Sequence, residues 1–581
     1  MRLISWESVF VSSAIAIGFG VDLPQASAQT VSPADLVPTA PPLIPVNPES
    51  PNLLLPPSEE LLKPSNPNPT ELYPQLKPPS STDTPTDTPT DTFIVREFQI
   101  VGSTVFSTEE LAATVKSFTD RPLTFTDLLQ VRSAIADLYI RNGYITSGAF
   151  IPPQEANNGM VTIQVIEGKL EDIQITGMNR LDPNYVESRL SQATVAPLNR
   201  DRLINALQLL QVDPLFSFVS AELKAGSELG TNILAVKVEE ANSFNAQIGI
   251  NNSAPVSVGQ LQRQIEISDR NLLGFGDKIT ASYGNTDGRN QYNFNYTIPI
   301  NPDSGTVSLS FSNTNSNIVE PEFKSLDIYA NSTTYEFSFR QPIIRTPAQE
   351  LAIGLTAAHS DSFTTLLKLP IPLSVGADDL GRTKLSILRF FQDYSQRSTE
   401  DVLSLRSQLS LGLGGVLNST ENVKSPDSNF VAWRGQMQYI RSLAEDTLLL
   451  VNGSLQFADR PLPAAERFSL GGALNGRGYR QDALIGDNGL NLSLEARFPI
   501  LRMPEVEGLL QVAPFVDFGS VWNHDSSATL TNNWLMGTGL GLRWQMGNRL
   551  TARLDYGFPL ISMSSNRQEN TMYFSLSYNL F

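Results

Sequence analysis

The chain of 581 residues contains no cysteine and only two histidines, His359 and His524. Without cysteine there is no disulfide framework, thiol nucleophile, cysteine-bound zinc or iron–sulfur cluster. Two isolated histidines also argue against a hydrolase Ser–His arrangement and against a metal site built from several histidines. We therefore expect a protein that is not an enzyme and that holds neither a metal nor a cofactor.

Charge is scarce and mostly negative. Charged residues make up 17% of the chain, whereas an ordinary soluble protein has roughly 25%. Hydrophobic residues, at 41%, do not make up for the low share of charged residues. The neutral polar residues Asn, Ser, Thr and Gln do. Acidic residues outnumber basic ones by 59 to 41, for a net charge of −18. This balance argues against a protein whose main task is to bind nucleic-acid phosphates.

Long apolar runs are also missing beyond the N-terminus. Residues 1–28 have the features of a secretory signal peptide, namely Arg2, the apolar run Val9–Val21 and the small residues Ala26 and Ala28. A retained membrane anchor is the alternative, but the run is too short for a hydrocarbon core of ~30 Å. The mature chain then has no transmembrane helix, which still allows a membrane-spanning β-barrel.

Residues 29–92 form a proline-rich segment that holds 17 of the 39 prolines and ends in the repeat Thr82–Pro89. Proline at this density disfavours helix and sheet and favours an extended, polyproline-like chain. We expect a disordered tether that acts as a passive spacer. A proline-motif ligand for another protein is the alternative.

Residues 93–168 and 169–241 repeat one pattern at a spacing of 75 residues. Each copy begins with a strand that ends at a glycine, at Gly102 and Gly177, and continues with two helices and two strands. The spacing predicts helices from Ser107, where Glu110 completes a capping box, and over 126–142, 183–190 and 200–211. It predicts the later strands over 145–151, 160–167, 219–225 and 233–239. Tandem α/β domains follow. An exposed sheet edge could add an extended peptide as a further strand. Two rigid spacers that bind nothing are the alternative.

Residues 242–581 have a hydrophobic period of two. Near the start Phe244, Ala246, Ile248 and Ile250 alternate with neutral polar residues. A soluble sandwich, which is the alternative, would carry charge on its polar face, whereas neutral polar residues suit a wet barrel lumen behind a lipid-facing exterior. The length predicts a transmembrane antiparallel β-barrel of about 16 strands. Residues 301–305 are expected to form a periplasmic turn and residues 312–332 an outer loop.

The end of the chain continues the alternation from Met572 to Leu580 and closes on Phe581. A terminal aromatic residue is the form of signal that outer-membrane assembly machinery reads. Phe581 falls out of step with the alternation, so the end of the last strand stays open.

One glycine-rich motif stands out, Gly476-Arg477-Gly478-Tyr479. It lacks the Gly-Lys-Ser/Thr and the strand–helix context of a nucleotide loop. On two later predicted strands, parity places Glu495 and Asp517 toward the lumen. A long loop folded into the barrel would bring the Arg477 guanidinium to both carboxylates. A generic lumenal salt bridge is the alternative.

The glycines Gly537, Gly539 and Gly541 alternate along another strand. They remove bulk from one face of the barrel.

These motifs together resemble one family. The first repeat, with Gly143–Thr146, Phe150–Gln154 and Val165–Gly168, is similar to a POTRA domain of the hemolysin secretion/activation (ShlB/FhaC/HecB-type) family. Gly476–Tyr479 resembles the tip of that superfamily's sixth extracellular loop, and Phe515-x-Asp517-x-Gly519 resembles its partner motif in the barrel. The resemblance implies a TpsB transporter of two-partner secretion, with two POTRA domains and a 16-stranded pore. Some members carry an N-terminal helix that plugs the pore, whereas residues 29–92 have too many prolines for a long helix.

The expected function is export of an unfolded TpsA-type exoprotein, hemolysin- or adhesin-like, from the periplasm to the surface of a Gram-negative-type cell without ATP. The POTRA pair would lie in the periplasm and the barrel in outer-membrane lipid. The expected partners are the exoprotein, this lipid and the barrel-assembly machinery, for a monomeric chain that binds no nucleic acid. A barrel-assembly insertase and a passive porin are the alternatives.

Overall fold

The computed structural model describes residues 92–154, 159–421, 426–524, 533–563 and 571–581. The described chain falls into two compact units, residues 92–241 and 242–581. The expected signal peptide (1–28) and the tether up to residue 91 lie outside the described residues. In the described ranges, no helix has both the length and the apolar character needed to cross a membrane.

In the first unit, residues 93–166 build a three-stranded sheet with two helices. The sheet has the order β2 (Glu97–Val101), β5 (Met160–Ile166), β4 (Gly148–Phe150), with β2 parallel to β5 and β4 antiparallel. Helices α1 (Thr108–Val115) and α2 (Phe125–Arg141) bury one face each against it, through residues such as Leu111, Val131 and Ile135. The capping box between Ser107 and Glu110 is confirmed, and Thr124 with Asp127 forms a second one.

The predicted first strand is wrong in one respect, because it breaks at Arg96. β1 (Phe93–Val95) leaves the sheet and pairs with β3 (Arg121–Leu123). The Arg96 amide instead donates to the Gly159 carbonyl at 2.8 Å. β3 was not predicted because it contains Pro122, which argues against a strand. Proline is tolerated here because β3 is an edge strand that, within the described residues, pairs only with β1.

Residues 169–240 repeat the plan. The sheet order is β6 (Lys169–Thr176), β8 (Thr231–Glu240), β7 (Phe216–Ala225), again with one parallel and one antiparallel pair. Helices α3 (Asn184–Ala193) and α4 (Arg200–Gln211) pack on it around buried Leu190, Leu207 and Leu234. The repeat inferred from the 75-residue spacing is therefore present in the fold.

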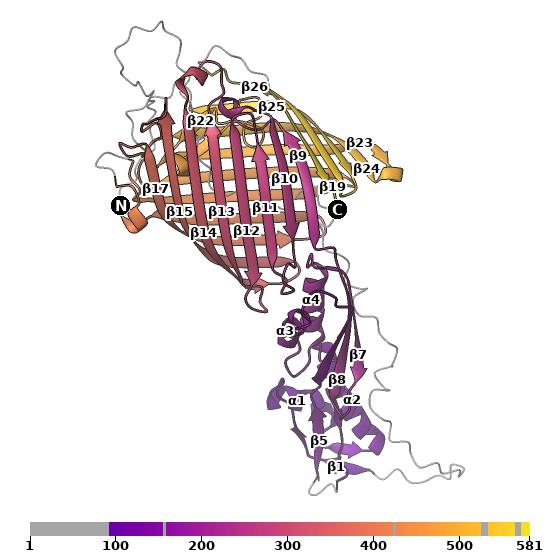
Figure 1. The fold of residues 1–581 in the computed structure, drawn as a ribbon. Helices are drawn as coiled ribbons and strands as arrows, with labels where there is room; N and C mark the ends of the chain where they lie inside the picture. Colours follow the sequence, from indigo (N-terminus) through magenta and orange to yellow (C-terminus); the bar gives the residue numbers. More distant parts are fainter. Residues whose placement is uncertain (1–91, 155–158, 422–425, 525–532, 564–570) are drawn as a thin grey trace, which may run out of the picture. The chain divides into compact units, whose positions relative to one another are not determined.

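The second unit is a closed antiparallel barrel of sixteen strands, as predicted (Figure 1). The strands are β9 (Phe244–Asn251), β10 (Gln262–Asp269), β11 (Lys278–Asn285), β12 (Arg289–Pro299), β13 (Thr306–Asn317), β14 (Tyr329–Arg345), β15 (Gln349–Leu366), β17 (Arg382–Arg397), β18 (Asp401–Gly412), β19 (Phe430–Ala444), β20 (Thr447–Ala458), β23 (Asn488–Met503), β24 (Gly508–Trp522), β25 (Trp534–Met546), β26 (Leu550–Pro559) and β27 (Thr571–Asn579).

Short elements lie in the connections between these strands. β16 (Leu369–Pro370) pairs with the end of β15, and β21 (Phe468–Leu470) pairs with β22 (Leu484–Gly486) in the long loop between β20 and β23. The 3-10 helices described in these connections are η5 (Val256–Val258), η6 (Lys324–Leu326), η7 (Val416–Asn418), η8 (Ala464–Glu466) and η9 (Pro504–Val506), whereas η3 (Lys116–Phe118) follows α1 in the first unit.

The predicted outer loop at 312–332 is shorter than expected. β13 continues to Asn317 and β14 begins at Tyr329, so only residues 318–328 connect them. The apolar face of β13, which includes exposed Leu309, changes to Asn313 and Asn315, and these bond to Thr333 and Asn331 of β14. The strands therefore pair beyond the apolar belt. A polar stretch there indicates the edge of the membrane rather than the end of the strand.

The barrel closes between its last and first strands. The pairing of β27 with β9 runs only from Ser575 opposite Asn251 to Asn579 opposite Gln247. Phe581 follows β27 as an exposed residue, and its ring centroid lies 5.5 Å from that of Phe244. The terminal aromatic residue is thus at the closing seam, outside the strand itself.

Candidate functional site: a loop held in the barrel lumen

The connection between β20 and β23, residues 459–487, is the longest between barrel strands and is packed among lumen-facing side chains. Leu462 and Leu470 are fully buried, and Arg477 and Tyr479 are 2% and 4% exposed. Leu492 and Phe518 face outward on β23 and β24, so Ser493 and Asp517 at the alternate positions face inward, where they contact Arg477. The loop therefore lies inside the barrel.

Arg477 is held by two carboxylates and an aromatic ring. Its Nε and NH2 donate to the two oxygens of Asp517 at 2.8 Å each, and its backbone amide donates to the same group at 2.9 Å. NH1 donates to Glu495 at 2.5 Å. The guanidinium carbon lies 3.5 Å from the ring centroid of Phe515. A two-point contact of this kind fixes the orientation of the guanidinium as well as its position.

Further charged residues extend this cluster. Arg543 donates to Glu495 at 2.7 Å and to Asp555 at 2.8 Å, and Arg497 donates to Glu495 at 2.9 Å. Arg553 bonds to Asp555 and also donates to the loop carbonyl of Ala473 at 2.9 Å. We refer to the wall residues of this group as the wall cluster. They are Arg497, Arg543, Arg553, Glu495, Asp517 and Asp555.

The wall cluster alone contains three arginines and three carboxylates, so it is formally neutral before Arg477 is added. Ser493 also donates to Asp517 at 2.7 Å. A buried carboxylate left without any partner is costly. Without the loop, Glu495 and Asp555 keep arginine partners in the wall cluster, whereas Asp517, which is fully buried, keeps only the Ser493 hydroxyl among the described residues.

Glycines make room for the loop tip. A Cβ atom on Gly537 would lie 2.0 Å from the Arg477 carbonyl oxygen, and one on Gly557 would lie 2.4 Å from the Gly478 nitrogen. One on Gly519 would lie 2.7 Å from Leu470 of the loop hairpin. Gly537, Gly557 and Gly519 therefore remove bulk where the loop needs close approach to the wall. Of the three alternating glycines of β25, only Gly537 meets the loop, since Gly539 and Gly541 meet residues of the wall. Gly478 itself has φ of +104°, which favours glycine.

Tyr479 ties the tip to the last strands. Its hydroxyl lies 2.8 Å from the Met536 carbonyl and 2.9 Å from that of Ile561. The Tyr573 hydroxyl of β27 donates to the Tyr479 carbonyl at 2.7 Å. The tip thereby reaches the strand that closes the barrel against β9.

A second anchor holds the root of the loop. Arg389 of β17 donates to Glu466 of the loop at 2.8 Å and to Glu336 of β14 at 3.0 Å, and Arg389 and Glu466 are buried. Leu462 packs in a cluster that includes Leu385 and Phe430 of the same side of the wall. We call Glu336, Arg389 and Glu466 the root clamp. The loop is thus fixed on β14 and β17 at its root and on β23 to β27 at its tip.

The structure brings together the residues that the motifs single out: Gly476, Arg477, Gly478 and Tyr479 with Glu495, Phe515, Asp517 and Gly519. Phe581 lies apart from them at the seam. Sequence reasoning missed the root clamp and the arginines of the wall cluster. For Arg543 and Asp555 a signal existed, because both occupy inward positions on neighbouring strands. Among the described residues, no group of acidic or histidine side chains is placed to hold a metal.

In the first unit, one glutamate in each repeat clamps the turn after the first strand. Glu167 accepts from the amides of Thr104 and Val105 and from the Tyr139 hydroxyl at 2.7, 3.2 and 2.8 Å. Burial alone would raise its pKa, but these hydrogen bonds lower it below the ordinary value.

Glu240 does the same in the second repeat. It accepts from the amides of Asn179, Arg180 and Leu181 at 2.6, 3.0 and 3.1 Å. These bonds lower its pKa, again against the opposite effect of burial.

Comparison with known proteins agrees with this geometry. Residues 230–544 match the family described as haemolysin secretion/activation protein ShlB/FhaC/HecB, and residues 93–168 match the POTRA domain, ShlB-type. The chain is 22% identical over 496 residues to the heme/hemopexin transporter protein HuxB of Haemophilus influenzae (strain 86-028NP), covering 81% of this chain and 84% of HuxB.

It is 23% identical over 491 residues to the outer membrane transporter CdiB of Dickeya dadantii (strain 3937), covering 81% and 83% of the two chains. The solved structure of CdiB from Escherichia coli superposes with a TM-score of 0.68 at 21% identity, over 87% of this chain and 93% of CdiB. This last likeness supports the fold.

Proposed function

Since this chain belongs to the haemolysin secretion/activation protein ShlB/FhaC/HecB family, we propose that its lumenal loop is the gate of a protein-secretion pore. The chain is an outer-membrane transporter of the two-partner secretion type, with its POTRA region in the periplasm. Its cargo is proposed to be a TpsA-type exoprotein that crosses the barrel unfolded. HuxB and CdiB carry transporter names of their own, and this chain's own exoprotein is to be found by experiment.

The observation that carries the proposal is the double fixation of the loop at residues 459–487. The root clamp holds it on β14 and β17, and Arg477 holds its tip on β23 and β24. A loop braced at both places obstructs the lumen. An extended polypeptide can pass only after at least one of the two attachments is released.

Release of the loop leaves a formally neutral remainder at either attachment. The wall cluster is neutral without Arg477, and Arg389 with Glu336 is neutral without Glu466. Loss of one partner from a buried pair costs roughly 3–5 kcal/mol. Arg389 keeps a carboxylate partner when Glu466 leaves, whereas Asp517 has no second arginine partner among the described residues. Both attachments are therefore proposed as parts of the gate, with Arg477 as the more strongly held of the two.

Cargo capture is assigned to the two α/β repeats, with residues 169–241 as a second POTRA domain. Each small sheet has two edge strands, and β7 is a ten-residue edge that pairs on one side with β8. An extended segment of cargo could add there as a further strand. No ATP is available in the periplasm, so folding of the cargo outside the cell would supply the direction of transport.

We also propose the state in which the chain works and how it is assembled. The chain works as a monomer in outer-membrane lipid and performs no enzymatic step. During its own biogenesis the barrel-assembly machinery reads the end of β27 with Phe581.

The test compares the secreted and outer-membrane proteins of a strain with and without the gene, and after complementation with wild type or Arg477→Ala. Loss of one or two large exoproteins, restored by wild type and not by Arg477→Ala, is expected. A general loss of outer-membrane barrels would mean an insertase. Reduced uptake of small solutes with all exoproteins retained would mean a porin.

A further inference from the structure

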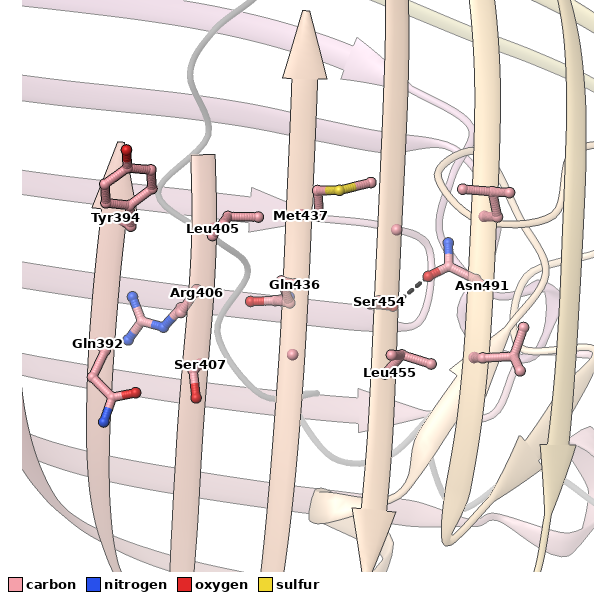
Figure 2. Close-up of a pocket in the computed structure, with 14 residues that line it drawn as sticks. Gln392, Tyr394, Leu405, Arg406, Ser407, Gln436, Met437, Ser454, Leu455 and Asn491 are labelled. Carbon is pink, nitrogen blue, oxygen red and sulfur yellow. Dashed lines mark hydrogen bonds between the residues drawn. The ribbon is translucent and has the colours of Figure 1, made fainter. Parts of the chain in front are cut away.

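A groove of about 610 Å³ lies in the wall formed by β17, β18, β19, β20 and β23 (Figure 2). Its lining residues include cross-strand neighbours in two adjacent rows. One row contains Gln392, Ser407 and Gly435, and the next contains Leu405 and Gly453. The volume lies within the roughly 300–1,000 Å³ of sites that take small organic ligands. The groove is distinct from the lumenal loop and its anchors.

The groove opens on the outer face of the wall. Leu405, Leu455 and Leu492 line it and are 37%, 39% and 40% exposed. Arg406, next to Leu405 in β18, points the other way and pairs with Asp393 at 3.3 Å. Because side chains alternate across a barrel wall, the leucines of the groove face the membrane.

Glycine at position 453 creates the hollow. A Cβ atom there would find its nearest neighbour, the Asn491 carbonyl oxygen, at 3.6 Å, followed by Met437 and Leu492 at 3.8 and 3.9 Å. These are ordinary contact distances, so a Cβ atom would fit above Gly453 without displacing a neighbour. By contrast, the space above Gly435 is taken by Trp433, whose ring would be 2.7 Å from such an atom.

Polar groups stand at one end of the groove. Tyr394 of β17 donates to Gln396 at 3.0 Å and accepts from Gln349 at 3.3 Å. Gln392, one outward position further into the membrane, makes no hydrogen bond to the protein within the described residues. An amide that faces hydrocarbon without a partner is costly, so a ligand with a hydrogen-bonding group suits this position.

That end of the groove faces the periplasmic leaflet. The POTRA region is periplasmic, and the chain enters the barrel at Phe244, so the ends of strands on that side face the periplasm. On the periplasmic side, β17 ends at Arg397 and β18 begins at Asp401. A tyrosine near such an end belongs to the interfacial aromatic belt, beside the ester groups of the lipids.

We propose that this groove binds one glycerophospholipid of the periplasmic leaflet. One acyl chain lies over Gly453 between Leu405, Leu455 and Leu492, and an ester carbonyl accepts a hydrogen bond from the Gln392 amide. The acyl chain of the lipid fills a void whose lining side chains would otherwise lack van der Waals contacts on that side. This inference needs the barrel to span the membrane and is independent of the gating role of Arg477.

The test measures phospholipid retained by the full-length protein after purification in mild detergent, by native mass spectrometry with lipid quantification. Wild type is expected to retain one glycerophospholipid molecule. Gly453→Leu fills the groove with its own side chain and is expected to retain none. Gln392→Leu, which removes one hydrogen bond of about 1 kcal/mol, is expected to retain about fivefold less.

Ala281→Leu is the matched control. It adds a similar apolar side chain at an exposed outward position of β11, away from the groove, and should retain lipid as wild type does. Equal retention by wild type, Gly453→Leu and Gln392→Leu would overturn the proposal, and so would retention of lipopolysaccharide in place of phospholipid. If Gly453→Leu fails to give a heat-modifiable barrel on a gel, Gln392→Leu alone decides.

Discussion

Arg389 of β17 and Glu466 of the lumenal loop form a buried ion pair, with 2.8 Å between the guanidinium NH2 and the carboxylate Oε1. Glu336 of β14 completes the clamp at 3.0 Å. The pair joins the root of the loop to a part of the wall several strands away from the contacts of Arg477. A loop with two separate ionic attachments can be released at one of them and stay in register at the other.

Glu466→Gln is expected to loosen the root of the loop. The neutral amide leaves Arg389 with Glu336 alone, which weakens the fixation by a large part of the roughly 3–5 kcal/mol that a broken buried pair costs. Single-channel recordings in planar lipid bilayers should show more frequent or longer open states than wild type. Glu445→Gln is the control, since that side chain is 86% exposed and lies 3.9 Å from Arg502. Equal open probability in wild type and Glu466→Gln would remove the root clamp from the gating scheme.

Arg477→Ala is expected to reduce secretion at least tenfold while the barrel is still inserted. The loop tip loses both carboxylate contacts and the stacking on Phe515. It then occupies the lumen without a fixed position on the barrel wall. Arg477→Lys should restore little, because an ammonium cannot make the two-point contact with Asp517. Exoprotein in the medium and heat-modifiable barrel in the outer membrane are measured together. Normal secretion by Arg477→Ala would refute the assignment of this loop.

Gly537→Ala tests the seat of the tip without altering any charge. The added methyl would lie 2.0 Å from the Arg477 carbonyl oxygen, so the tip must move away from β25. We expect an ion conductance higher than that of wild type. We expect secretion to lie between the levels of wild type and Arg477→Ala. Gly249→Ala is the matched control, because its methyl would meet the Leu576 carbonyl oxygen at 3.6 Å, an ordinary contact. A similar effect of both substitutions would mean that any added bulk perturbs the barrel.

The architecture could be read from the sequence because it depends on local periodicity. Apolar residues that alternate with neutral polar residues, as from Phe244 to Ile250, predict barrel strands. The spacing of 75 residues predicts that one α/β pattern occurs twice. Strand parity placed Glu495 and Asp517 on the inner face, and both contact Arg477 in the structure.

The features that were not predicted depend on the path of the chain in space. Glu466 meets Arg389 across 77 positions of sequence, and no local pattern indicates which of many inward arginines lies under the loop. The break at Arg96 depends on the position of the Gly159 carbonyl, to which the Arg96 amide donates. The alternating glycines of β25 were interpreted as a loss of bulk, but that the loop tip occupies the space above Gly537 is evident only from the contact with Arg477.

The carboxylate of Glu167 makes the stability of the first α/β repeat depend on pH. Its pKa in the folded chain is lowered by hydrogen bonds from Thr104, Val105 and Tyr139. A group with a lowered pKa in the folded state contributes stability above its unfolded value, about 4.3 for glutamate. This contribution is lost as the pH falls through the folded pKa. Hydrogen bonds to a charged group contribute roughly 1.5–3 kcal/mol when the group is buried, and less for the partly exposed Glu167 because water screens its charge.

Glu167→Gln is therefore expected to lower the free energy of unfolding of this repeat by about 1 kcal/mol at neutral pH, because the amide oxygen can still accept and water screens the charge, and to make less difference below about pH 4. The measurement is urea unfolding of the full-length protein followed by far-ultraviolet circular dichroism, since the α-helices of the described chain lie in residues 92–241. Glu187→Gln serves as control, because this α3 residue makes no side-chain ion pair among the described residues. A loss of stability that is the same at every pH would show that Glu167 acts through the shape of its side chain and not through its charge.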